Sequence, residues 1–173
     1  MTNERERAAY HEAGHVIGAE SCHHVVVLSR IGPAIGYGST RVWPAWADPW
    51  SAGIIAACGP LAELFFDPSA PLNATAIATD DRRVWRAALE LADGDERRAR
   101  EWWRQVRSAA VDVVAENWAA VERVAAALMR HGALDEVAVR SVAGVVTRAP
   151  PPPILRPAER SMLARNRENR YNR

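Results

Sequence analysis

Two histidines and a glutamate near the start of the chain have the types and spacing of a metal-dependent hydrolytic site. His11, Glu12 and His15 form an H-E-x-x-H pattern inside residues 3–21, whose apolar spacing predicts a helix. Residues four apart lie one above the other on a helix face, so both imidazoles can reach one Zn²⁺ ion. Glu12 follows His11 directly and projects beside the metal, where it can take a proton from the zinc-bound water. The pattern therefore predicts metal-assisted hydrolysis.

A catalytic zinc site needs a third protein ligand, which must come from another part of the chain. The candidates are acidic residues in later predicted helices: Glu63, Asp80 and Asp81. The pair Asp80 and Asp81 is favoured, because a carboxylate at the exposed start of a helix can reach across a cleft. The alternative is that the pair only stabilises the helix dipole. His23 and His24 lie too near the motif in sequence to return to it easily, and Cys22 is better explained as a structural residue.

Short strands and an aromatic loop are predicted after the first helix. The β-branched residues 25–28 predict a strand, and residues 35–42, after a turn at Gly32 and Pro33, predict a second one. A small sheet of two or three strands follows from this. Residues 43–50 contain three tryptophans and two prolines, which predicts a loop with aromatic anchors.

The remainder of the chain is predicted to be helical. Ser51 is expected to cap a helix over 51–66, with a kink or break near Gly59 because of Pro60. After a loop over 67–78, Thr79 is expected to cap a helix that ends near residue 92. Further helices are predicted over 96–130, ended by Gly132, and over 134–145. The predicted fold class is thus mostly α with a small β-sheet (α+β).

Composition places the chain among ordinary globular domains. It has 173 residues, of which 49% are hydrophobic, with 22 basic and 21 acidic residues and no lysine. These values exclude wholesale disorder, a collagen-like repeat and a disulfide scaffold. The two cysteines indicate reduced thiols. The sequence opens without a secretory signal, and its longest apolar stretch is shorter than the roughly 20 residues of a membrane span. We therefore expect a soluble, cytoplasmic protein.

The C-terminal part differs in kind, which predicts two regions: a folded domain over 1–146 and a flexible tail over 147–173. The tail contains an uninterrupted run of four prolines, and residues 148–173 hold seven arginines against two glutamates. Arginines of this kind could contact nucleic acid or an acidic surface, but aromatic residues do not alternate with them. A solvated tail is the favoured interpretation, so nucleic acid is not expected as a partner.

The residues around the metal motif resemble a known family. The string Ala9-Tyr10-His11-Glu12-Ala13-Gly14-His15 resembles the active-site helix of the FtsH-type peptidases, the zinc protease half of the membrane-bound AAA proteases. Later segments resemble, in order, the family's glycine-tyrosine strand segment (34–37), its Gly-Arg-Ala-Ala-Glu helix (58–63), its Ser-Asn-Asp helix start (79–81) and the turn before its last helix (133–135). The resemblance covers residues 4–146 and implies an FtsH-like peptidase fold.

This resemblance implies a role for each residue of the motif. His11 and His15 would be zinc ligands, and Glu12 would be the catalytic base. Glu63 would be a structural carboxylate that holds a zinc-ligating histidine in orientation. The third ligand stays open between two neighbours: ungapped spacing from Thr79 points to Asp81, while the apolar register downstream fits better if Asp80 is the ligand.

The chain also departs from the family. A sequence without lysine has no Walker A segment, so the family's ATP-driven unfolding is not expected from this polypeptide, and neither are its transmembrane helices. Pro60 stands where the family has an arginine. The segment over 42–51 is short and rich in tryptophan, so the family's substrate preference does not carry over.

Together, these features predict a zinc-dependent metalloendopeptidase that acts on unfolded or flexible protein segments. The sheet edge near residues 36–42 would align an extended substrate strand. A separate unfoldase or a dedicated protein partner is a further expectation, and the oligomeric state is left open. The alternative is a non-enzymatic protein-interaction module that keeps the peptidase fold.

Overall fold

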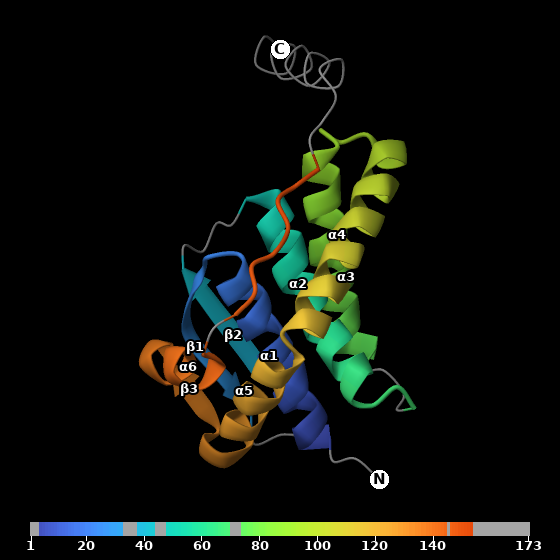
Figure 1. Ribbon diagram of the computed structural model, residues 1–173. Helices are drawn as coiled ribbons and strands as arrows, with labels where there is room; N and C mark the ends of the chain where they lie inside the picture. Colours follow the sequence, from blue (N-terminus) through green and yellow to red (C-terminus); the bar gives the residue numbers. More distant parts are fainter. Residues whose placement is uncertain (1–3, 33–37, 44–47, 70–73, 145, 154–173) are drawn as a thin grey trace.

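A computed structural model of the chain describes residues 4–32, 38–43, 48–69, 74–144 and 146–153. Its elements are, in order, α1 (Glu4–Ser21), β1 (Val25–Ile31), β2 (Gly38–Trp43), α2 (Pro49–Phe66), α3 (Ala74–Leu91), α4 (Glu96–Glu116), α5 (Trp118–His131), β3 (Ala133–Asp135) and α6 (Glu136–Ala143). The fold is mostly helical with one small antiparallel sheet (Figure 1). The predicted α+β class is confirmed.

Helix α1 is the central element of the fold. It contacts α2, α4, α5 and strands β1 and β2, and all its residues from 11 to 19 are buried. Two glycines let α2 approach closely: a Cβ added at Gly14 would lie 2.3 Å from the carbonyl oxygen of Cys58, and one at Gly18 would lie 3.1 Å from its Sγ. This close approach explains a glycine inside a helix, where alanine would be about 1 kcal/mol more favourable. The predicted first helix is confirmed over its described residues.

The sheet has the strand order β2-β1-β3, with both pairs antiparallel. Ser29 lies opposite Thr40 of β2 and opposite Leu134 of β3. Strand β1 extends three residues beyond its predicted end, and β2 is confirmed from Gly38 onward, while residues 35–37 lie outside the described part of the chain.

Strand β3 corrects the prediction of a helix over 134–145. Leu134 is buried and pairs with β1, so it forms a third strand where a helix was expected. Asp135 then accepts a hydrogen bond from the backbone N–H of Ala138 and caps α6. The range 134–145 therefore begins with two strand residues, which are followed by a helix shorter than the predicted one.

Helix α2 begins earlier than predicted and is not broken. Its N-cap is Asp48, whose Oδ1 accepts hydrogen bonds from the backbone N–H groups of Trp50 and Ser51. Ser51 is therefore not the cap, because the aspartate three residues before it already serves the first turn. The helix continues through Pro60, held in place by α1, α3 and α4 packed around it. By length and composition it is also the one helix of the described residues that could cross a membrane, but more than half of it is buried inside the fold.

Two other helix boundaries differ from the predicted ones. Helix α3 begins at Ala74, so Thr79 lies inside the helix and does not cap it. Alanines at positions 74, 76 and 78 favour a helical conformation, in agreement with a helix that begins before Thr79. The predicted helix over 96–130 is two helices that meet at Asn117, whose amide donates to the carbonyl oxygens of Val113 and Thr147. The predicted breaks at residues 93–95 and at Gly132 are confirmed.

The segment after α6 runs back across the fold toward the end of the molecule where α3 ends and α4 begins (Figure 1). The backbone N–H of Ala149 donates to the carbonyl oxygen of Ser21 at 3.0 Å, and the indole N–H of Trp50 donates to that of Pro150 at 2.9 Å. The first residues of the predicted tail are thus hydrogen-bonded to the domain, and residues 154–173 lie outside the described part of the chain.

Candidate metal centre

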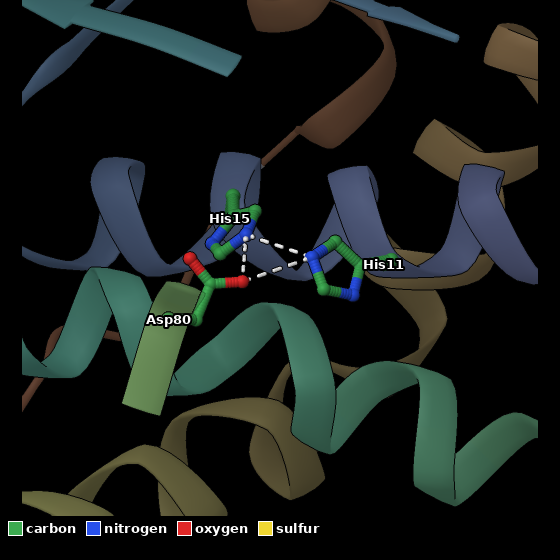
Figure 2. A group of neighbouring side chains, drawn as sticks. All are labelled: His11, His15 and Asp80. Carbon is green, nitrogen blue, oxygen red and sulfur yellow. Dashed lines mark hydrogen bonds and ion pairs between the residues drawn. The ribbon is translucent and has the colours of Figure 1, made fainter. Parts of the chain in front are cut away.

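His11, His15 and Asp80 converge on one point in the interior of the fold (Figure 2). The two histidines come from α1 and the aspartate from α3. Nε2 of His11 lies 3.1 Å from Nε2 of His15 and 3.1 Å from Oδ2 of Asp80, and the third side of this triangle measures 3.3 Å. All three residues are buried, and one ligand atom of each lies within 4.8 Å of the others. This group could hold a metal ion.

The far nitrogen of each imidazole is held by a partner that orients the ring. Nδ1 of His15 lies 2.8 Å from the carbonyl oxygen of Ile55 on α2. A carbonyl can only accept, so in a neutral ring this nitrogen carries the proton, and Nε2 has the lone pair that a metal ion would bind. Nδ1 of His11 lies 3.1 Å from Oε2 of Glu63 in the same way. The predicted contact of Glu63 with a histidine of the motif is confirmed.

Two carboxylates, Asp80 and Glu63, stabilise the charged form of His11. Burial disfavours a charged imidazole, but hydrogen bonds to Asp80 and Glu63 outweigh burial and raise the pKa of His11 from 6.5 to about 9. Burial also disfavours the carboxylate form of Glu63 and of Asp80, yet hydrogen bonds with His11 hold both pKa values below their ordinary range. Glu63 is further paired with Arg7. The cluster thus keeps its carboxylates ionised.

Asp80, and not Asp81, belongs to the group. Asp80 is buried, and its second oxygen, Oδ1, accepts a hydrogen bond from Arg83 at 3.0 Å. Arg83 thereby leaves only Oδ2 of Asp80 to face the histidines. Asp81 is partly exposed and pairs with Arg107 of α4 at 3.0 Å. The alternative that Asp81 is the third ligand therefore has no support in the geometry, since its carboxylate is engaged on another side of α3.

Glu12 is buried beside the cluster and contacts the sheet. Its Oε2 accepts a hydrogen bond of 2.7 Å from the hydroxyl of Thr40 on β2. Its Oε1 packs against Gly38, where an added Cβ would lie only 2.4 Å away. The glutamate of the motif is thus held at the strand that forms one edge of the sheet.

A second glycine makes room for the side of His15 that faces His11 and Asp80. A Cβ added at Gly59 of α2 would lie 2.4 Å from Nε2 of that imidazole. Sequence analysis did not identify Gly59, Thr40, Arg7 or Arg83 as parts of the site. Thr40, Gly59 and Arg83 come near the motif only through the packing of β2, α2 and α3, so no local pattern marks them, whereas Arg7 lies on α1 itself, four residues before His11.

The remaining sequence candidates lie outside the group. Neither His23 nor His24 belongs to the metal-binding group found among the described residues. Burial raises the pKa of Cys22 to about 11 and that of Cys58 well above its usual value. Buried thiols of this kind are poor metal ligands because the thiolate is the ligand form. Both cysteines are free, which fits a structural role.

A scan against models of known protein families matches none of them, and a search of curated proteins finds no similar sequence. The candidate metal centre therefore rests on its own contacts. Three buried donors come together from two helices, with a carboxylate behind one histidine and a backbone carbonyl behind the other.

Proposed function

We propose that the protein is a zinc-dependent metalloendopeptidase. The observation that carries the proposal is the spacing of the three donors of His11, His15 and Asp80, which are 3.1–3.3 Å apart. Donors bound to one zinc ion at about 2.0–2.1 Å in a tetrahedral arrangement would be separated by about 3.3 Å. The side chains therefore already have nearly the separations that a single tetrahedral ion requires.

The chemistry of the donors also favours zinc. Two neutral imidazoles and one carboxylate form a typical catalytic zinc site, in which three protein ligands leave one position open. Arg83 fits this count, since it donates a hydrogen bond to Oδ1 of Asp80, while Oδ2 is the oxygen that faces the histidines. When bound, zinc supplies an acidified water and polarises the carbonyl of the bond to be cut.

Glu12 is suited to move the proton in this reaction. It is buried next to His11 and is the one glutamate of the motif. In the proposed reaction, Glu12 takes a proton from the attacking water, whose oxygen bonds to the carbonyl carbon. It then gives that proton to the amine nitrogen as the carbon–nitrogen bond breaks. The carboxylate is regenerated and one water is consumed for each bond.

The edge strand β2 is the proposed binding site for the substrate backbone. Among the described residues it pairs with β1 alone, and two of its residues, Gly38 and Thr40, contact Glu12. A peptide added as a further strand at this edge would pass beside the base. Only an extended segment can bind in this way, so the proposed substrates are unfolded or flexible polypeptides, delivered in the cell by an unfoldase or a dedicated partner. These features fit the FtsH-like fold inferred from the sequence.

The test is hydrolysis of an unfolded, casein-like polypeptide by the zinc-loaded protein and by its Glu12→Gln variant, purified side by side. We expect cleavage by the wild type alone, with one zinc ion retained in both proteins. Efficient cleavage of a stably folded substrate would contradict the strand-addition proposal. If both proteins bind zinc and the polypeptide but neither cuts it, the non-enzymatic interaction module replaces the peptidase.

A further inference from the structure

The carboxylate of Glu12 is bounded on both oxygens by strand β2. Thr40 donates its hydroxyl to Oε2 at 2.7 Å, and Gly38 leaves just enough room for Oε1. Glu12 itself stands on α1, but a glutamate side chain rotates about three bonds, so the helix alone does not determine where its carboxylate points. That direction is determined by the strand.

Thr40 is in turn held by Ser29 of the neighbouring strand. The two residues are cross-strand partners, and their hydroxyl oxygens lie 2.8 Å apart. A hydroxyl has one proton to donate, and Thr40 donates its proton to Oε2 of Glu12. Ser29 must therefore donate to Thr40. Because Ser29 is fully buried, it has no water to compete for this bond.

We propose that Thr40 is a positioning residue for the general base, and that Ser29 fixes the hydroxyl of Thr40 in the orientation that serves it. The proposal rests on the proposed peptidase function, in which Glu12 is the base. It adds that the base is aimed by the same strand that would align the substrate. Positioned groups of this kind raise the rate of the chemical step without changing how tightly substrate binds.

Kinetics of three full-length zinc-loaded variants test the proposal. Thr40→Val keeps the shape and strand preference of threonine but removes the donor, and Thr40→Ser restores a hydroxyl. We expect Thr40→Val to lower kcat at least tenfold, with KM changed less than twofold. The kcat of Thr40→Ser should stay within threefold of the wild-type value, and the kcat of Ser29→Ala should lie between those of the two Thr40 variants. The proposal is overturned if Thr40→Val keeps the wild-type kcat, or if Thr40→Ser is as impaired as Thr40→Val.

The matched control is Thr147→Val, the same exchange at an exposed threonine whose bonds to Asn117 come from its backbone. It should leave kcat unchanged. Crystal structures of the variants supply a measurement that needs no activity: the Glu12 carboxylate should leave its position in Thr40→Val and keep it in Thr40→Ser. If Glu12 keeps its position in Thr40→Val, the proposal is overturned, whatever the kcat of that variant. If the wild type cuts nothing, the peptidase proposal fails, while these structures still decide whether Thr40 positions Glu12.

Discussion

Asp80 and Asp81 are consecutive residues of α3 whose carboxylates contact different parts of the fold. Oδ2 of Asp80 lies 3.1 Å from Nε2 of His11, while Oδ1 of Asp81 lies 3.0 Å from a guanidinium nitrogen of Arg107. Successive residues of a helix project about 100° apart, so only one of the two can face α1. The exposure of the side chains agrees: 4% for Asp80 and 44% for Asp81.

Replacing each aspartate separately should therefore give opposite results. We expect Asp80→Ala to weaken zinc binding by more than about 100-fold, since even loss of a residue behind a ligand weakens binding by about 10–100-fold. Asp81→Ala should change zinc affinity by less than about threefold and stability by less than about 1 kcal/mol, because its ion pair is partly exposed. Competition titration against a chromophoric chelator measures both. Equal losses in the two variants would contradict the assignment of the third ligand.

Glu63 should contribute to metal affinity without touching the metal. It accepts a hydrogen bond from Nδ1 of His11 and thereby fixes the ring and its proton. We expect Glu63→Gln to weaken zinc binding by about tenfold and Glu63→Ala by closer to about 100-fold, because the amide of glutamine still accepts a hydrogen bond but carries no charge. Zinc titrations of both variants measure this order, and an affinity equal to that of the wild type in Glu63→Ala would refute it.

The motif could be found from the sequence because its geometry is local. His11 and His15 are four residues apart, and any regular helix places them on one face. The choice between Asp80 and Asp81 could not be made in the same way. It depends on where α3 begins and how it is rotated against α1, and the predicted cap at Thr79 was wrong because α3 begins at Ala74.

Long-range contacts also explain the errors in the fold. The sequence around Leu134 has a helical pattern, but Leu134 pairs with β1 and becomes part of the sheet. The helical periodicity continues through Asn117, and the break there is stabilised by Thr147, thirty residues later. Neither partner is visible in a window of local sequence. By contrast, Gly94 and Gly132 marked real boundaries, because both adopt positive φ angles that favour glycine.

Gly59 should be required by the metal site rather than by the fold alone. An added Cβ would lie 2.4 Å from Nε2 of His15, so we expect Gly59→Ala to displace that imidazole and weaken zinc binding at least tenfold. The control is Gly53→Ala in the same helix, where the new methyl would meet Val106 at 2.8 Å, away from the metal. Both variants should lose about 1–3 kcal/mol of stability through overpacking. Normal zinc affinity in Gly59→Ala would show that the site tolerates the added methyl.

The metal-free protein should lose stability as the pH rises from 6.5 to 9. The pKa of His11 is about 9 in the folded chain and 6.5 without its partners. Above pH 6.5, the folded chain therefore holds a proton that the unfolded chain releases, so the free energy of unfolding falls with rising pH. Chemical denaturation in chelator, at a series of pH values, measures the slope. His11→Gln should flatten it, and an equal slope in this variant would assign the effect to another group.

His11, His15 and Asp80 are proposed to bind one zinc ion together, and X-ray absorption spectroscopy of the zinc-loaded protein measures the ligands of that ion. We predict a four-coordinate ion with only nitrogen and oxygen neighbours at about 2.0–2.1 Å, including the outer-shell scattering of two imidazoles. A sulfur neighbour at about 2.3 Å, a six-coordinate oxygen shell without imidazole, or failure to take up zinc would contradict the claim.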